Sequence, residues 1–123
     1  MKKIISCDKA PAAIGPYSQA IEANGFVYVS GQLPIQNGEL KTDIVEATHA
    51  SLSNIKAILE SAQLTMADVA KVEIFLKDMN DFAKVNEVYG TYFADPYPAR
   101  ACVEVARLPK DAPVEIQCIA VRK

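Results

Sequence analysis

The chain has 123 residues, of which 50% are hydrophobic and 23% charged, and this length and balance predict a single globular domain over residues 1–123. A formal net charge of −2 and scattered lysines argue against a surface that binds nucleic acid. Three widely spaced cysteines and one histidine favour reduced thiols over disulfides and supply too few ligands for a conventional zinc site.

The first residues predict no secretory signal. Lys2 and Lys3 give a basic start, but Asp8 and Lys9 end the apolar run at once. No segment approaches the roughly 20 apolar residues of a membrane span. We therefore expect a cytoplasmic protein without a membrane partner.

The first half of the chain combines a hairpin signal with a long helix. Asn24-Gly25 joins two β-prone runs, and Gly31 is expected to end the second, with a loop over residues 34–38. Residues 43–62 show helical spacing, with Asp43 as N-cap and Glu46 in capping-box spacing. His49 falls on the polar face of this helix, and a solvated residue is its simplest interpretation.

The second half predicts a strand, a helix and two further strands. Alternation over residues 69–77 predicts a half-buried strand, and Asn80 is the expected N-cap of a helix that ends at the prolines after Asp95. Strands are expected over residues 101–106 and 114–121. The apolar stripe of this second helix consists of Phe82, Val85, Tyr89, Tyr92 and Phe93.

This order of elements predicts an α+β fold, with a sheet on one side and both helices on the other. Residues 116–121 are apolar on both faces apart from Gln117. We therefore expect the outer face of the sheet to meet a partner subunit.

Arg100 is the first candidate for ligand binding. It is one of three arginines, and it enters an apolar strand just after Pro98. A guanidinium is costly to desolvate there unless it meets an anion, and its planar fork fits a carboxylate. The sequence therefore predicts a site for a small acidic ligand.

A thiol and acids accompany this arginine. Strand alternation places Arg100, Cys102 and Glu104 on one face. Cys102 has no neighbouring histidine, so a small buried residue is a better interpretation than a nucleophile. Glu115 is the sole acid of the last strand and suits either proton transfer or an ion pair at a subunit seam, and both stay open.

Other candidate contacts are weaker when read singly. Ser30-Gly31 could expose a hydroxyl and backbone amides to an anion, but the residues alone favour a strand-ending turn. Tyr17 and Asn86 are plausible ligand contacts, but a structural role is the better interpretation when each is read singly. With no phosphate loop, nucleophile elbow or metal motif, the residues predict a small-acid site with little catalytic machinery and no metal.

Four segments resemble one known family. Residues 10–20 and 29–34 are similar to its amino-terminal motifs, residues 98–109 to its carboxyl-terminal signature, and residues 114–116 follow at a fitting distance. The family is the RidA/YjgF group of reactive-intermediate deaminases, and the resemblance runs essentially end to end.

The resemblance implies a chorismate-mutase-like α+β fold, with a mostly antiparallel sheet and two helices on one face, assembled as a homotrimer with ligand sites between subunits. It implies hydrolysis of 2-aminoacrylate, 2-iminopropanoate and 2-iminobutanoate to 2-oxo acids and ammonia, without a cofactor. Arg100 matches the residue that pairs with the substrate carboxylate, and Glu115 the acid that activates water. The other matching pocket positions are Tyr17, Ser30, Gly31, Asn86 and Cys102, the last as a contact.

Two other functions stay open at this point. Family members have also been described as translation-inhibiting ribonucleases, but the acidic balance counts against RNA binding. A trimeric sensor of small 2-oxo acids would use the same Arg100. Glu115 separates sensor from enzyme, because a sensor needs no acid that activates water.

Overall fold

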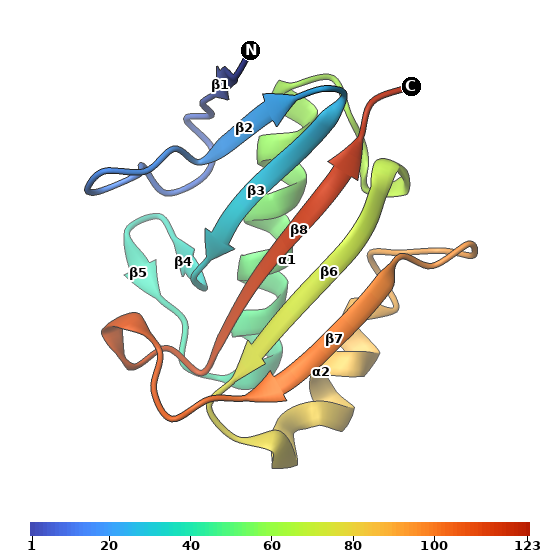
Figure 1. The fold of residues 1–123 in the computed structure, drawn as a ribbon. Helices are drawn as coiled ribbons and strands as arrows, with labels where there is room; N and C mark the ends of the chain where they lie inside the picture. Colours follow the sequence, from blue (N-terminus) through green and yellow to red (C-terminus); the bar gives the residue numbers. More distant parts are fainter.

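A six-stranded sheet backed by two helices forms the body of the molecule in the computed structural model, which describes residues 1–123 (Figure 1). The strand order is β1-β2-β3-β8-β6-β7, and every neighbouring pair is antiparallel except β6 and β7. The α+β class and the mostly antiparallel sheet are therefore confirmed. The strands are β1 (Lys3–Ile5), β2 (Ala20–Ala23), β3 (Phe26–Gln32), β6 (Val69–Leu76), β7 (Ala99–Glu104) and β8 (Val114–Val121).

The predicted hairpin joins β2 to β3. Asn24 and Gly25 both have positive φ, at 53° and 81°, as a tight turn between twisted strands requires. The prediction that Gly31 ends the second strand is wrong, because β3 continues to Gln32 with a register shift after Val29. Such an irregularity bends a strand without ending it.

The expected loop after β3 contains a small hairpin of its own. Its strands are β4 (Ile35–Gln36) and β5 (Glu39–Leu40), which form a separate two-stranded sheet. Asn54 fixes this hairpin to the first helix, since its side-chain amide donates to the carbonyl of Ile35 at 3.0 Å. The hairpin is therefore held against the main body by a buried amide rather than by the sheet.

Helix α1 (Ile44–Ser61) agrees with its predicted range to within one residue at each end. Oδ2 of Asp43 accepts from the backbone N–H of Glu46 at 3.1 Å, which satisfies one of the free donors of the first turn. His49 lies on the exposed face, as expected, with Nδ1 at 3.0 Å from the hydroxyl of Tyr92.

Helix α2 (Phe82–Tyr89) is shorter than predicted and starts differently. Asn80 is not its N-cap, because a 3₁₀ turn (Met79–Asp81) precedes α2 and the side chain of Asp78 caps that turn. Asp78 and Asn80 are both good capping residues, and the earlier one acts. The helix ends at Gly90, so Tyr92 and Phe93 lie in the turn that follows rather than on a helical stripe.

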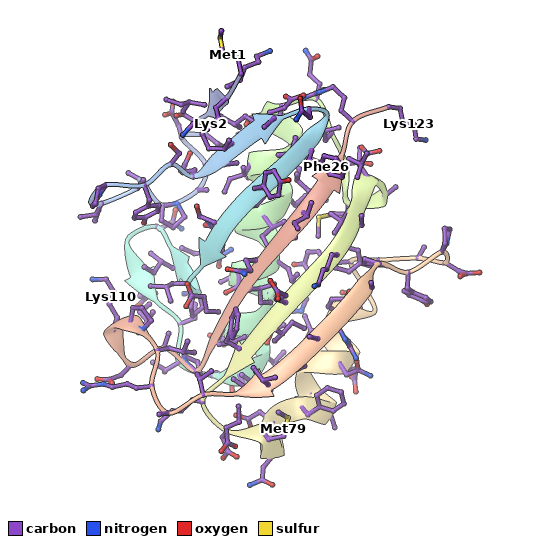
Figure 2. The ribbon with its side chains drawn as sticks, viewed as in Figure 1. Met1, Lys2, Phe26, Met79, Lys110 and Lys123 are labelled. Atoms are coloured by element: carbon purple, nitrogen blue, oxygen red, sulfur yellow. The ribbon has the colours of Figure 1, made fainter.

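Both helices cover the same face of the sheet, as predicted (Figure 1). Alternate residues of the central strands point to this side and are fully buried, among them Ile74 and Ile116. The opposite face carries no helix, and Tyr28 and Val103 on it are 47% and 46% exposed. Phe26 lies on the same open face (Figure 2). None of the helices has the length and hydropathy of a membrane span.

Candidate active site

Arg100 lies on β7, at the edge of the sheet, and points to the helix-covered side. Its Nη1 donates to Oδ1 of Asn86 on α2 at 2.6 Å. The guanidinium carbon lies 4.7 Å from the ring centroid of Tyr89 and 5.6 Å from that of Phe82. No carboxylate forms an ion pair with Arg100. The remaining guanidinium donors are therefore available to an anion from outside the protomer.

A cavity of about 460 Å³ opens beside this arginine. Its lining comes from α2 and the glycine that ends it, from the segment just before β7, and from β7 itself. The lining residues are Asn86, Tyr89, Gly90, Tyr97, Pro98 and Arg100. We call it the arginine half-site.

Cys102 and Glu104 share the helix-covered side with Arg100, as strand alternation predicted. Cys102 is half-buried against the core, and burial raises the pKa of its thiol while the nearby charge of Arg100 opposes the shift. The thiol is therefore protonated near neutral pH, which is unfavourable for a nucleophile. Glu104 accepts from the backbone N–H of Met79 at 2.7 Å and fixes the turn before α2.

Glu115 lies on β8, on the open face of the sheet, where it pairs in register with Phe75. Burial raises the pKa of its carboxyl, and no side chain of the protomer forms an ion pair or hydrogen bond with it. The carboxylate lies against the backbone of Gly31. A Cβ built at Gly31 would overlap Oε2 of Glu115 and lie 2.9 Å from Cδ, so a side chain there would displace the acid.

A second cavity, of about 680 Å³, surrounds this acid. We call it the acid half-site, and the predicted residues that line it are Tyr17, Ser30, Gly31 and Glu115. Lys110 also borders it, from the loop between β7 and β8 (Figure 2). The hydroxyl of Ser30 donates to the carbonyl of Ser18 at 2.5 Å, which leaves its lone pairs free to accept.

Gln19 belongs to the acid half-site and was missed by the sequence analysis. Its side chain is 6% exposed, accepts from the N–H of Cys7 at 2.6 Å and donates to the carbonyl of Pro11 at 2.7 Å. These bonds tie the loop that carries Tyr17 to the edge of the sheet. The only signal in the sequence is a polar residue directly before an apolar strand, which is too common to single it out.

The two half-sites are separate within one protomer. Arg100 pairs with Val72 of β6, whereas Glu115 pairs with Phe75 of the same strand. With β6 between them, two inter-strand spacings and a stagger of three residues separate their backbones by about 14 Å. Their side chains also point to opposite faces of the sheet, and the two cavities share no lining residue. A ligand that touches both residues must therefore lie between two copies of the chain.

The chemistry available is electrostatic and acid–base. No group of three or more His, Cys, Asp or Glu side chains is placed to hold a metal ion. One half-site offers a guanidinium for a carboxylate, and the other offers a desolvated acid for proton transfer. Together they suit a small acidic substrate that reacts with water.

Comparison with known proteins identifies the family. The family model described as endoribonuclease L-PSP matches residues 7–122. A RutC family protein of Pyrococcus horikoshii is 54% identical, and the 2-iminobutanoate/2-iminopropanoate deaminase of Escherichia coli is 47% identical, each over the full length of both chains. The solved structure of Escherichia coli TdcF with bound serine has a TM-score of 0.93 at 46% identity, covering 98% of this chain and 99% of that one.

The structure of the YjgF gene product of Escherichia coli gives the same result, with a TM-score of 0.93, 46% identity, and coverage of 98% of this chain and 99% of that one. Identity at this level over nearly complete chains leaves no large insertion between the motifs singled out above. The chain belongs to the RidA/YjgF family.

Proposed function

We propose that the chain hydrolyses small 2-imino acids, and the enamines that tautomerise to them, to 2-oxo acids and ammonia. The observation that carries this proposal is the pair of complementary half-sites, with an arginine lacking a counter-charge in one and a desolvated acid lacking a cation in the other. Full-length similarity to a 2-iminobutanoate/2-iminopropanoate deaminase supports the reaction class.

The complete site lies between protomers in a homotrimer. Arg100 and Asn86 of one protomer face Glu115, Tyr17 and Ser30-Gly31 of the next. A head-to-tail contact between the two half-sites gives a ring when its rotation closes, and the resemblance to the family implies a ring of three. The open sheet face, with its half-exposed aromatic and aliphatic side chains, supports such packing.

Binding begins with the substrate carboxylate on the guanidinium of Arg100. Asn86 occupies one Nη1 proton, so the other donors form the bidentate pair. This contact fixes the C2 carbon of the substrate relative to Glu115 across the interface. An enamine first takes a proton at C3 and becomes the imine, which is already electrophilic at C2.

Hydrolysis then needs one proton shuttle. Glu115 takes a proton from water as the oxygen bonds to C2 and passes that proton to the imine nitrogen, which gives a neutral tetrahedral carbinolamine. Glu115 then takes the proton of the carbinolamine hydroxyl and delivers it to the nitrogen. The C2=O bond forms as the C–N bond breaks, and ammonia leaves the 2-oxo acid. A carboxyl whose pKa is raised by burial suits this exchange, because it accepts a proton more readily than an exposed carboxyl and can still return it.

A coupled assay tests the proposal. A serine or threonine dehydratase generates the enamine, and release of the 2-oxo acid is timed with and without the protein. We expect a clear acceleration, and failure to accelerate contradicts the proposal. Replacing Arg100 with alanine removes a desolvated charge pair worth about 2–5 kcal/mol. We therefore expect kcat/KM to decrease by a factor between about 30 and several thousand, while the trimer persists.

A sensor of 2-oxo acids remains the second candidate, because the arginine half-site alone accounts for carboxylate binding. The two functions differ at Glu115. Under the enzyme proposal Glu115→Ala loses turnover, whereas a sensor binds 2-oxo acids with or without that acid and shows no turnover even in the wild type. Calorimetric binding of 2-oxobutanoate, measured beside the coupled assay, separates them.

A further inference from the structure

We propose that the rings of Tyr89 and Phe82 position the Arg100 guanidinium for the substrate carboxylate. We call these two rings the aromatic shelf. Tyr89 and Phe82 are therefore positioning residues, which act on the substrate through Arg100. The inference deepens the proposed function and rests on its assignment of Arg100.

The spacing along α2 builds this shelf. Phe82, Asn86 and Tyr89 stand at positions i, i+4 and i+7, which share one face of a helix. All three contact the guanidinium: the two rings at 5.6 and 4.7 Å, and the amide oxygen of Asn86 at 2.6 Å. Both ring distances fall within the range of about 6 Å at which a cation is attracted to an aromatic face.

Arg100 needs such a support because of where it lies. It stands on the edge strand β7, where a long, flexible side chain can adopt many rotamers. No carboxylate of the protomer holds it. The shelf and Asn86 restrict the guanidinium while using only one of its five N–H donors. The fork therefore stays open to the substrate with less entropy to lose on binding.

The ring of Tyr89, rather than its hydroxyl, carries this function. The residue is 5% exposed, and its hydroxyl is buried without a hydrogen-bond partner. Burial raises the pKa of the hydroxyl, so the side chain is neutral near pH 7. Its ring also packs against that of Phe93, with centroids 4.6 Å apart, which limits its motion. A phenylalanine at position 89 keeps every one of these ring contacts.

The experiment compares Tyr89→Phe with Tyr89→Leu, and uses Val88→Ala as a control for loss of a buried α2 side chain that does not contact Arg100. The dissociation constant of 2-oxobutanoate is measured by calorimetry, and KM and kcat by the coupled assay. We expect Tyr89→Leu to raise the dissociation constant and KM about three- to tenfold with kcat nearly unchanged. Tyr89→Phe and Val88→Ala stay within about twofold of the wild type.

Equal loss in Tyr89→Phe and Tyr89→Leu, or no loss in Tyr89→Leu, overturns the inference. If Tyr89→Leu does not fold, Phe82→Leu decides, because Phe82 is 36% exposed and tolerates truncation better. Phe82→Leu is expected to raise the dissociation constant about three- to fivefold, whereas Phe82→Tyr stays within about twofold of the wild type. A dissociation constant within about twofold of the wild type in Phe82→Leu contradicts the shelf.

A ligand-free measurement keeps this inference distinct from the proposed function. Nuclear magnetic resonance of the Arg100 Nε–H group reports the order of the guanidinium in the protein alone. Greater mobility in Tyr89→Leu, but not in Tyr89→Phe, supports the shelf even if the wild type shows no turnover. Unchanged order in Tyr89→Leu contradicts the shelf even if deamination is observed.

Discussion

Gly31 gives the carboxylate of Glu115 its place against the backbone. Gly31→Ala puts a Cβ where Oε2 of the acid lies. The end of a glutamate side chain can move aside, so we expect a cost of only about 1 kcal/mol in the free energy of unfolding. The displaced acid is expected to lower kcat by up to about a hundredfold, because small misplacements of a reacting group slow catalysis strongly.

A double-mutant cycle in urea unfolding checks this explanation. If the alanine acts by pushing on the acid, Gly31→Ala costs less free energy of unfolding in a Glu115→Ala background than in the wild type. Equal costs in the two backgrounds would mean that Gly31 is needed for the bend of β3 and not for the acid.

The raised pKa of Glu115 makes both activity and stability depend on pH. Its folded-state pKa lies above the ordinary value of 4.5, so this group contributes stability below the unfolded-state pKa that is lost as pH rises through the folded value. At neutral pH the ionised acid therefore destabilises the fold. Glu115→Gln is expected to unfold at a higher urea concentration than the wild type at pH 7, measured at one protein concentration.

Glu115→Gln also removes the proposed proton shuttle. We expect kcat to fall by about 10²–10⁴-fold, the usual contribution of general acid–base catalysis. In the wild type, kcat/KM falls as the pH drops through the pKa of Glu115, with a midpoint above 4.5, and this limb disappears in Glu115→Gln. A limb that persists in the variant assigns the proton transfer to another group.

Helix α1 packs against one face of the sheet, and the side chain of Asp43 caps its first turn. Asp43→Ala removes the acceptor for the N–H of Glu46 and is expected to cost about 1 kcal/mol in the free energy of unfolding. Lys56→Ala, on the exposed face of the same helix, is the control and should change stability by less than about 0.5 kcal/mol. Similar effects of the two substitutions would contradict the role of Asp43 as a cap.

Elements with a long, regular pattern of apolar residues could be predicted from the sequence. Elements whose limits depend on a choice between capping residues, or on pairing with another strand, could not. α1 and β8 carry long regular patterns, and their observed ranges agree with the predicted ones. The start of α2 depends on which of two capping residues acts, and Asp78 precedes the predicted Asn80. Strand β1 is three residues long and is defined by its pairing with β2, which no pattern within the segment reports.

At the scale of the whole molecule, the candidate residues were predictable singly but their grouping was not. Alternation placed Arg100 and Cys102 on one face of their strand. It did not say which face of the sheet that would be, since this depends on the register between β7 and β6. The structure groups Asn86 with Arg100, and Tyr17 and Ser30 with Glu115, on opposite sides.

This division implies that each proposed site draws residues from two copies of the chain. Arg100→Ala and Glu115→Gln each damage one half-site and leave the other intact. In the proposed trimer, a mixture of the two variants forms some interfaces that combine the intact arginine half-site of one protomer with the intact acid half-site of the next.

The most direct test is the deaminase activity of these mixed trimers, prepared by co-expression or by joint refolding of equal amounts. Each variant alone should be nearly inactive. Random mixing restores about a quarter of the sites, so the mixture should recover about a quarter of wild-type activity. A mixture no more active than its separate components, with mixed trimers verified by mass spectrometry, would contradict a site shared between protomers.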